Sequence, residues 1–149
     1  MKIFLGADHR GFELKERLKK WLSSRGYEYE DLGAHELDPK DDYTHYASKV
    51  GEAVGVDHVD RGILICGSGI GADVVANKFK GVRAGLGKNE KQVAAGRNDD
   101  DMNVLVLASD FTTQKEAEEM VRVFLETKFE SSERFKRRLS DIEKIEKNR

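Results

Sequence analysis

The alternation of short apolar runs with longer segments of helical periodicity most constrains how this chain can fold. Such alternation predicts parallel strands joined by right-handed helical crossovers, with helices on both faces of one sheet. The only proline, Pro39, lies in a predicted loop at 34–41. The predicted strands are 2–7, 27–32, 62–66, 82–86 and 104–107, and the predicted helices are 12–22, 46–54, 71–79, 89–97, 113–127 and 132–146.

The predicted architecture is a Rossmann-like, doubly wound α/β fold. Five parallel strands form the middle layer of a three-layer αβα sandwich. A chain of 149 residues suits one domain and can bury a core without disulfides or metals. The sequence contains no internal repeat, low-complexity segment or linker, so residues 1–149 are predicted to form one domain.

Composition narrows the classes of function. Hydrophobic residues make up 38% and charged residues 36%, which is typical of a globular, soluble chain. The formal net charge of -2 argues against a nucleic-acid or membrane-surface partner. No apolar run is long enough to span a bilayer, and the N-terminus does not resemble a signal peptide. The single cysteine fits a reducing compartment, so the protein is expected in the cytoplasm.

The segment 65–71, Ile-Cys-Gly-Ser-Gly-Ile-Gly, carries the clearest functional signal. Gly67, Gly69 and Gly71 allow a tight turn with exposed N–H groups, and the following helix adds the positive end of its dipole. Together these features predict an anion-binding cradle. The spacing Gly-x-Gly-x-Gly differs from the dinucleotide fingerprint, and no Gly-Lys-Ser/Thr follows, so nucleotide binding is only a remaining alternative.

Cys66 stands at the end of the third predicted strand, immediately before this cradle. A cysteine beside a helix N-terminus is expected to ionise more easily than a free thiol, whose pKa is about 8.5. Cys66 could therefore act as a base or a nucleophile. The alternative is that it is a small buried apolar residue. The adjacent cradle favours the chemical role.

These residues resemble the family of ribose-5-phosphate isomerase B and the two subunits of galactose-6-phosphate isomerase. The resemblance covers nearly the whole chain. The segments that carry it are Gly6-Ala7-Asp8-His9, Asp42-Tyr43 with His45-Tyr46-Ala47, residues 62–71, Ala76-Asn77-Lys78, Gly81-Val82-Arg83-Ala84, Asn103-Val104-Leu105 and Arg134-Phe135-Lys136-Arg137-Arg138.

The resemblance implies an aldose–ketose isomerase of sugar phosphates that uses no metal and no organic cofactor. The implied reaction moves a proton between C1 and C2 through an enediolate, which the glycine turn stabilises. The implied assembly is a homodimer or a dimer of dimers, with sites shared between subunits and the C-terminal helix packed on a partner. The implied roles are Cys66 as base, Ser68 as its helper, Gly67, Gly69 and Gly71 as cradle, Asp8, His9 and Tyr43 as substrate contacts, and Arg134 and Arg138 as ligands of the neighbouring subunit's phosphate.

The C-terminal helix gives separate support for the last of these roles. Arg134 and Arg138 are spaced i, i+4 and share one helix face. An adjoining apolar stripe could pack on the same domain or on a partner. A solvated charge run is the alternative interpretation. The stripe consists of Phe135, Leu139, Ile142 and Ile145.

The chain departs from the family pattern at several positions. Members that open sugar rings usually carry His-Asn before the fifth strand, where this chain has Asp99 as the implied catalytic group and Asp100 as a substrate contact. Asp110 replaces an arginine after that strand, and Phe135 replaces a histidine. The three acidic changes make the site more negative, which is unfavourable beside a phosphate dianion and alters the acid–base partner for ring opening.

Other histidines do not obviously replace the missing one. His45 is expected on the helix after Tyr43, and His35 and His58 are expected in surface loops.

The leading interpretation is an isomerase of ribose 5-phosphate. A tetrose phosphate is a second candidate substrate, because it cannot close a five-membered ring and needs no ring-opening histidine. The chain could also be one subunit of a heteromeric hexose-6-phosphate isomerase. The interpretation from another class is an inactive sugar-phosphate-binding relative, against which Cys66, Asp8 and His9 argue.

Overall fold

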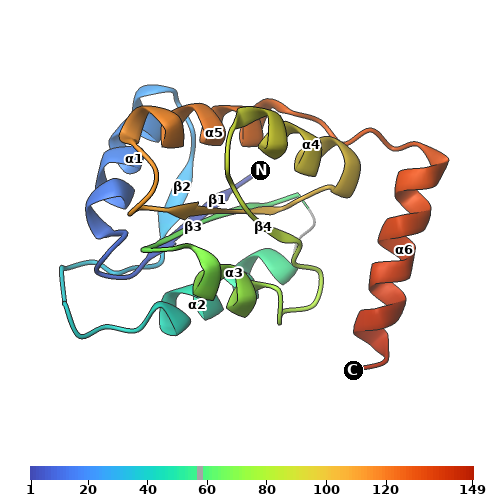
Figure 1. Cartoon of the computed structure of the whole chain (residues 1–149), viewed down its shortest axis with the longest axis horizontal. Helices are drawn as coiled ribbons and strands as arrows, with labels where there is room; N and C mark the ends of the chain where they lie inside the picture. Colours follow the sequence, from blue (N-terminus) through green and yellow to red (C-terminus); the bar gives the residue numbers. More distant parts are fainter. Residues whose placement is uncertain (57–58) are drawn as a thin grey trace.

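The computed structural model of the protein describes residues 1–56 and 59–149 (Figure 1). In this part of the chain, five strands alternate with helices, and a sixth helix follows. The strands are β1 (Ile3–Ala7), β2 (Tyr29–Asp31), β3 (Arg61–Cys66), β4 (Ala84–Leu86) and β5 (Val104–Ala108). The helices are α1 (Phe12–Ser24), α2 (Tyr43–Val56), α3 (Ile70–Ala76), α4 (Glu90–Asp100), α5 (Gln114–Glu126) and α6 (Glu133–Lys147).

The sheet is parallel throughout, in the order β2-β1-β3-β5-β4. The predicted doubly wound α/β fold is therefore confirmed. The order reverses at β1, which pairs with β2 on one side and β3 on the other. In doubly wound sheets, ligands bind outside the carboxyl ends of the strands at such a switch point. The loops after β1 and β3 are therefore the first place to look for a site.

Helices cover both faces of the sheet. Helices α1, α4 and α5 lie on one face, and α2 and α3 lie on the other (Figure 1). The central strands are buried on both faces and are accordingly almost entirely apolar. Two hydrophobic clusters result, one on each side of the sheet. No helix in the described ranges is long and apolar enough to cross a membrane.

Several element boundaries differ from the predicted ones. Phe79 was expected in the third helix, but α3 ends at Ala76, and Phe79 packs instead against Gly51 of α2. The fourth strand begins at Ala84 rather than at residue 82. The side chain of Asn103 bonds the Arg83 N–H at 2.7 Å and the Gly81 carbonyl at 2.7 Å, and the Arg83 carbonyl accepts the Asn103 N–H at 3.0 Å, so side-chain and backbone bonds together hold the segment before β4.

The histidine predictions hold for the residues that can be placed. His35 is exposed outside helices and strands, and His45 is exposed on α2. His58 lies outside the described residues.

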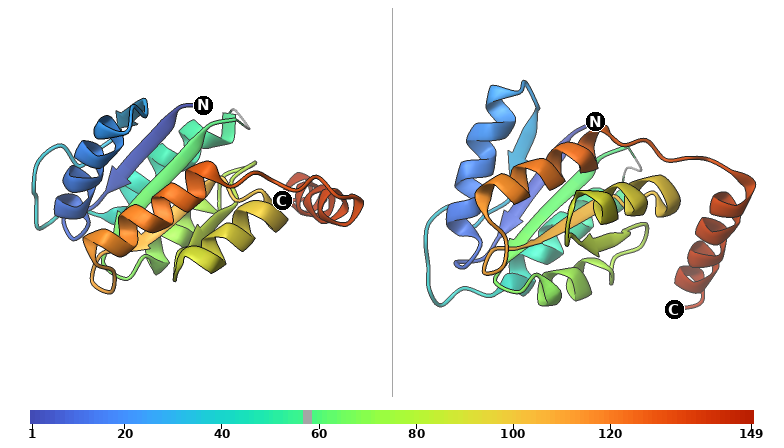
Figure 2. Two further views of the ribbon diagram at one scale, coloured as in Figure 1. Left: turned by 90° about the horizontal axis from the view of Figure 1, so that it is seen from above. Right: turned by 45° about the horizontal axis from the view of Figure 1, so that its top comes forward.

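Helix α6 stands apart from the sandwich (Figure 2). None of its residues is buried, although Ile142 and Ile145 belong to its apolar stripe. Its C-terminal end is attached to the domain through Glu146, whose carboxylate accepts the Gly81 N–H at 3.1 Å. Phe135 and Leu139 are half-buried, whereas Ile142 and Ile145 are exposed, so part of the stripe is left uncovered by its own domain.

A buried ion pair joins α1 to the end of β2. The Lys15 side chain is fully buried, and its Nζ bonds both Asp31 oxygens at 2.6 and 2.7 Å and the Ala34 carbonyl at 2.6 Å. Burial alone would raise the pKa of Asp31, but hydrogen bonds from Lys15, Lys19 and the Gly33 N–H lower it below its ordinary value. The ion pair therefore stabilises the fold above the ordinary carboxyl pKa, and this contribution is lost as the pH falls through the folded-state pKa.

We expect Asp31→Asn to lower the free energy of unfolding by about 3–5 kcal/mol, because it removes the hydrogen-bonded counter-charge of a buried ammonium and leaves only the half-exposed Glu16, 3.5 Å away. Urea denaturation at pH 7 measures the change. Glu30→Gln is the matched control, since it also removes one negative charge from β2. Glu30 forms an exposed pair with Lys2 and should cost at most about 1 kcal/mol. Equal losses in the two variants would contradict this account.

Candidate active site

The candidate site lies at the carboxyl edge of the sheet, where the loops after β1, β3 and β5 meet. Backbone hydrogen bonds join these loops. The Ser109 N–H donates to the Cys66 carbonyl at 2.9 Å, and the Asp110 N–H donates to the Gly67 carbonyl at 3.1 Å. The Ser109 hydroxyl reaches across to the Arg10 carbonyl at 2.9 Å. Three segments that are far apart in the sequence are therefore held in one arrangement.

A cavity of about 310 Å³ opens at this edge. The cavity brings together most of the predicted site residues, namely Asp8, His9, Tyr43, Cys66, Gly67, Ser68 and Gly71. Three charged residues that the sequence analysis did not assign to the site also line it, namely Arg10, Asp41 and Asp42. Their position in the sequence could have indicated them, because Arg10 follows His9 and Asp41-Asp42 precede Tyr43.

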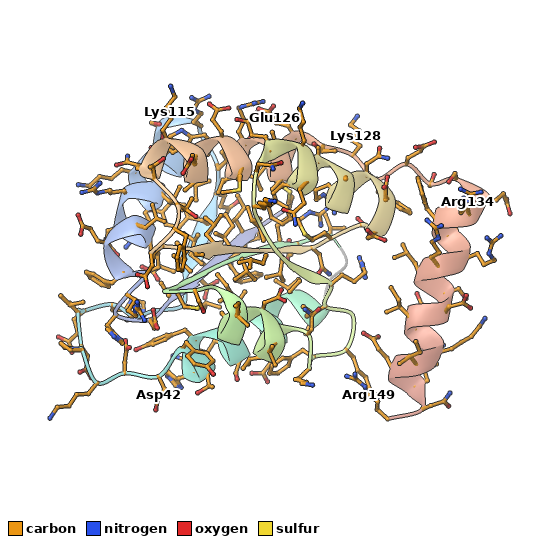
Figure 3. The ribbon with its side chains drawn as sticks, viewed as in Figure 1. Asp42, Lys115, Glu126, Lys128, Arg134 and Arg149 are labelled. Carbon is orange, nitrogen blue, oxygen red and sulfur yellow. The ribbon has the colours of Figure 1, made fainter. Side chains whose placement is uncertain are left out.

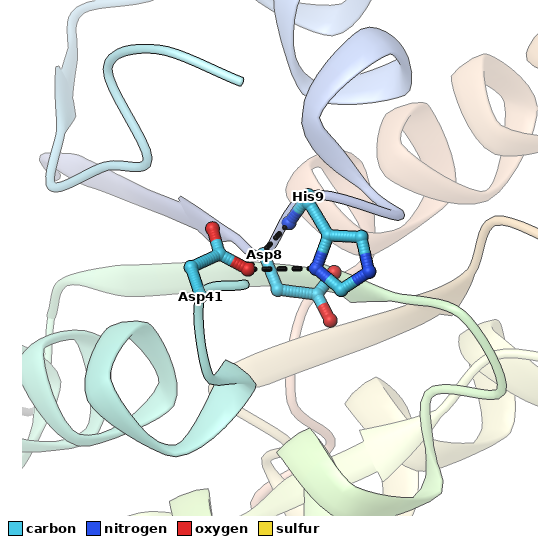
Figure 4. Close-up of side chains that lie close together, drawn as sticks. All are labelled: Asp8, His9 and Asp41. Atoms are coloured by element: carbon cyan, nitrogen blue, oxygen red, sulfur yellow. Dashed lines mark hydrogen bonds and ion pairs between the residues drawn. The ribbon is translucent and has the colours of Figure 1, made fainter. Parts of the chain in front are cut away.

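Asp41 orients His9 (Figure 4). One Asp41 oxygen, Oδ1, accepts the His9 backbone N–H at 3.0 Å and lies 2.8 Å from the ring Nδ1. This contact holds the imidazole in place and leaves its Nε2 free to meet a ligand. Among the residues that the structure describes, the other oxygen of Asp41 is buried without a hydrogen-bond partner.

Asp8 is nearly buried beneath His9. Its Oδ1 accepts the backbone N–H groups of Arg10 and Gly11, both at 3.1 Å. Burial raises the pKa of Asp8, while these two N–H groups and His9 act in the opposite direction. The carboxyl group is therefore held rigidly, and its neutral form is favoured compared with that of an exposed aspartate.

Asp8, His9 and Asp41 are also the group of side chains whose geometry could hold a metal ion, with ligand atoms within 4.8 Å of one another. The hydrogen bonds described above already account for their arrangement. Asp8 and Asp41 each direct an oxygen at backbone N–H groups, and Asp41 also faces the His9 ring nitrogen.

Cys66 is 4% exposed at the end of β3. Burial raises the pKa of its thiol above the ordinary value, and the N–H groups of Ala72 and Gly69 oppose this rise without overcoming it. The expectation that Cys66 ionises more easily than a free thiol is therefore wrong for the isolated chain. The N–H groups of the cradle lower the pKa of the thiol, as predicted, but the loss of hydration on burial raises it by more.

Two positions in the turn require glycine. Gly69 has a φ of +76°, a backbone conformation that side chains disfavour. A Cβ on Gly71 would lie 2.5 Å from the ring of Tyr43. The absence of a side chain at Gly71 therefore allows Tyr43, the first residue of α2, to close over the turn.

Asp110, one of the acidic departures, is paired in this structure. Its carboxylate forms an ion pair with the guanidinium of Arg10. The Arg10 side chain in turn lies on the turn, because a Cβ on Gly67 would be 2.6 Å from Arg10 Nε. The negative charge introduced at position 110 is thus offset by a cation from the loop after β1.

Five predicted site residues do not line the cavity: Gly69, which lies within the turn itself, and four residues that are distant from it in a single chain. Asp99 and Asp100 end α4, next to the beginning of β5, whereas Cys66 pairs in register with Ala108 at its end. A strand rises about 3.3 Å per residue, so β5 alone separates them by on the order of 15 Å. Arg134 and Arg138 lie on α6. Figure 3 shows Arg134 on the far side of the molecule from Asp42, which lines the cavity.

The fold and the site thus define a doubly wound α/β protein with a thiol, a carboxylate, an imidazole and a glycine turn around one strand-end cavity. Comparison with known proteins identifies its family. The model of the ribose/galactose isomerase family matches residues 3–142. The chain therefore belongs to the ribose/galactose isomerase family, as its motifs predict.

Individual relatives agree with this placement. The chain is 38% identical to ribose-5-phosphate isomerase B of Escherichia coli, over 99% of this chain and 98% of that protein. The crystal structure of ribose-5-phosphate isomerase B from Mycoplasma genitalium with bound ribulose 5-phosphate superposes with a TM-score of 0.95 at 40% identity, covering 99% of this chain and 97% of the other. A 4-deoxy-4-sulfo-D-erythrose isomerase of a Clostridium species is 33% identical, over 87% of this chain and 81% of that protein.

The raised pKa of Cys66 has a measurable consequence. The thiolate is the form that reacts with iodoacetamide, so the alkylation rate should climb through the neutral range and level off only above the ordinary thiol pKa of about 8.5. Mass spectrometry follows the reaction, since Cys66 is the only cysteine. Cys66→Ser supplies the unreactive control. A plateau below pH 7.5 would show that the cradle outweighs burial.

Proposed function

We propose that this protein is an aldose–ketose isomerase of sugar phosphates that converts ribose 5-phosphate to ribulose 5-phosphate. The observation that carries the proposal is the cavity in which Cys66 and the glycine turn face Asp8, His9 and Tyr43. Membership of the ribose/galactose isomerase family supports it, as do relatives named ribose-5-phosphate isomerase B. Residues 1–149 are proposed to act as one domain.

In the proposed mechanism, the Cys66 thiolate removes the proton from C2 of the open-chain aldose. The electron pair of the C–H bond forms the C1–C2 double bond, and negative charge moves to the C1 oxygen. The N–H groups of the turn stabilise the resulting enediolate, as in an oxyanion hole. The C2 hydroxyl then passes its proton to the C1 oxygen, and as the C2 carbonyl forms, the electrons of the C1–C2 double bond take the proton back from the thiol at C1. Ser68, which lines the same cavity, is proposed to assist these transfers.

A raised thiol pKa is compatible with this role. The thiolate is a minor species at neutral pH, but it is a stronger base towards a C–H bond than an easily ionised thiolate would be. The thiol must also hold the proton long enough to return it to the neighbouring carbon. Asp8, His9 and Tyr43 are proposed to bind the sugar hydroxyls and to orient C1 and C2 towards Cys66.

The proposed active form is a homodimer, or a dimer of dimers. Two observations support this assembly. The apolar stripe of α6 is not buried by its own domain. In addition, the cavity contains three carboxylates and only one permanently charged cation, Arg10, among its lining residues, which is a poor environment for a phosphate dianion. Arg134 and Arg138 of a second copy would supply the missing positive charge. A cytoplasmic location is part of the same proposal.

The test of the chemical role is the substitution Cys66→Ser. It preserves size and hydrogen bonding but replaces the thiol with a hydroxyl that does not ionise in the accessible pH range. We expect turnover of ribose 5-phosphate to fall by at least about 10²-fold, the lower end of what a positioned acid–base group contributes. Conversion to ribulose 5-phosphate is measured by absorbance, and circular dichroism confirms the fold. Wild-type turnover in this variant would remove Cys66 from the mechanism.

A short open-chain substrate is the second candidate. Asp99 and Asp100 stand where ring-opening relatives have His-Asn, so the imidazole that suits proton exchange with the ring oxygen near neutral pH is missing. A tetrose phosphate needs no ring opening. The similarity to a 4-deoxy-4-sulfo-D-erythrose isomerase, whose named substrate is a four-carbon sugar, favours this candidate specifically.

The two candidates predict different responses to Asp99→His. If ring opening limits the reaction, this substitution should raise kcat/KM for ribose 5-phosphate by up to about 10²-fold and leave a tetrose phosphate nearly unchanged. A panel of tetrose, pentose and hexose phosphates, assayed with the purified protein alone, gives the comparison. Efficient wild-type turnover of ribose 5-phosphate, unaffected by Asp99→Ala, would exclude a ring-opening role for this residue. Inactivity on the whole panel would favour a heteromeric or non-catalytic protein.

A further inference from the structure

Arg10 has no assigned role, yet it is the one arginine or lysine among the residues that line the Cys66 cavity. Its side chain is held at two points. The guanidinium pairs with Asp110 after β5, and Nε and Cζ lie against Gly67, the first residue of the turn. Its backbone is held as well, because its N–H donates to Asp8 and its carbonyl accepts the Ser109 hydroxyl.

Two residues that are far from Arg10 in the sequence, Gly67 and Asp110, determine where its side chain lies. A side chain on Gly67 would collide with the guanidinium, so only a glycine there allows this approach. Asp110 follows β5 and is brought opposite Arg10 because its own N–H bonds the Gly67 carbonyl. The arginine, the aspartate and the glycine thus form one unit beside Cys66.

We propose that Arg10 is a positioning residue that stabilises the negative charge of the Cys66 thiolate, and that Asp110 holds its guanidinium in place to do so. The inference rests on the proposed function of Cys66 as the base. In the reaction, the same positive charge would favour the anionic enediolate formed next to the thiol. The backbone N–H groups of Gly69 and Ala72 act in the same direction, but Arg10 is the one arginine or lysine among the lining residues, whose other charged side chains are mainly carboxylates.

The charged, titratable and hydrogen-bonding groups around Cys66 come from four segments. The loop after β1 brings Asp8, His9 and Arg10, and the segment leading into α2 brings Asp41, Asp42 and Tyr43. The turn after β3 contributes backbone N–H groups, and the loop after β5 contributes Asp110 through its pair with Arg10. Asp8 raises the pKa of the thiol and Arg10 lowers it, both less than burial does. Removing Arg10 therefore leaves the carboxylates without an opposing fixed charge.

The experiment measures the rate at which iodoacetamide, a neutral reagent, alkylates Cys66 between pH 6 and 10. We expect Arg10→Gln to slow alkylation at pH 7.5 about three- to tenfold, which corresponds to a pKa higher by about half a unit to one unit. Arg10→Lys keeps the charge and should react within about twofold of the wild type. Arg17→Gln is the matched control, because it also removes one arginine charge but does not line the Cys66 cavity, and its guanidinium bonds Glu13 and Gln114.

Asp110→Asn tests the second half of the inference through a double-mutant cycle, which cancels the direct field of Asp110. If Asp110 holds the guanidinium against Gly67, Arg10→Gln should slow alkylation less than about twofold in the Asp110→Asn background. A full three- to tenfold effect in that background would overturn the positioning role of Asp110.

Two other outcomes would overturn the role of Arg10 itself. One is an alkylation profile of Arg10→Gln that matches Arg17→Gln. The other is an Arg10→Lys profile that matches Arg10→Gln, since a lost contact rather than a lost charge would then be responsible. Alkylation does not depend on turnover, so these results are separable from the proposed function. A protein inactive on every sugar phosphate, but with the expected alkylation pattern, would refute the proposal that this chain alone is an isomerase and leave the Arg10–thiolate interaction standing.

Discussion

The parallel pairing of β1 with β3 is the constraint on which the site depends. Because the two strands run in the same direction and in register, their ends reach the same edge of the sheet. Asp8 and His9 leave β1 there, and Cys66 ends β3 there. Pairing of β3 with β5 adds Ser109 and Asp110 to the same edge. A carboxylate, an imidazole, a thiol and a glycine turn thus meet at one edge, although they come from segments that are far apart in the sequence.

Burial and charge act against each other at this edge. The same packing that makes β3 a central strand removes water from Cys66 and disfavours its thiolate. The N–H groups of the turn and the Arg10 guanidinium act in the opposite direction, while Asp8 adds to the effect of burial. A group in this balance can both accept and return a proton, which suits the proposed transfer between two carbon atoms better than a permanently ionised thiolate would.

A single chain holds only part of the proposed site. Its own cavity residues would supply the proposed base, sugar contacts and enediolate cradle, but Arg134, Arg138, Asp99 and Asp100 lie away from the cavity. The uncovered stripe on α6 and the excess of carboxylates in the cavity both point towards a second copy as the source of the missing groups. Assembly and phosphate recognition would then be one event, since α6 carries both the apolar stripe that a partner would cover and the arginines that would reach the partner's cavity.

The sequence by itself determined the parallel α/β fold, the strand-end position of Cys66 and the glycine turn, because these depend on local periodicity and on motifs whose residues adjoin one another. It also placed Asp8, His9 and Tyr43 near the site. Only the tertiary structure decided how Arg10 meets Asp110, how Asp41 orients His9, and that burial outweighs the cradle at the thiol. The first two are contacts across 32 to 100 residues of chain that exist only once the sheet register is set. The third is a sum over every neighbour that excludes water, and no local pattern in the sequence encodes that sum.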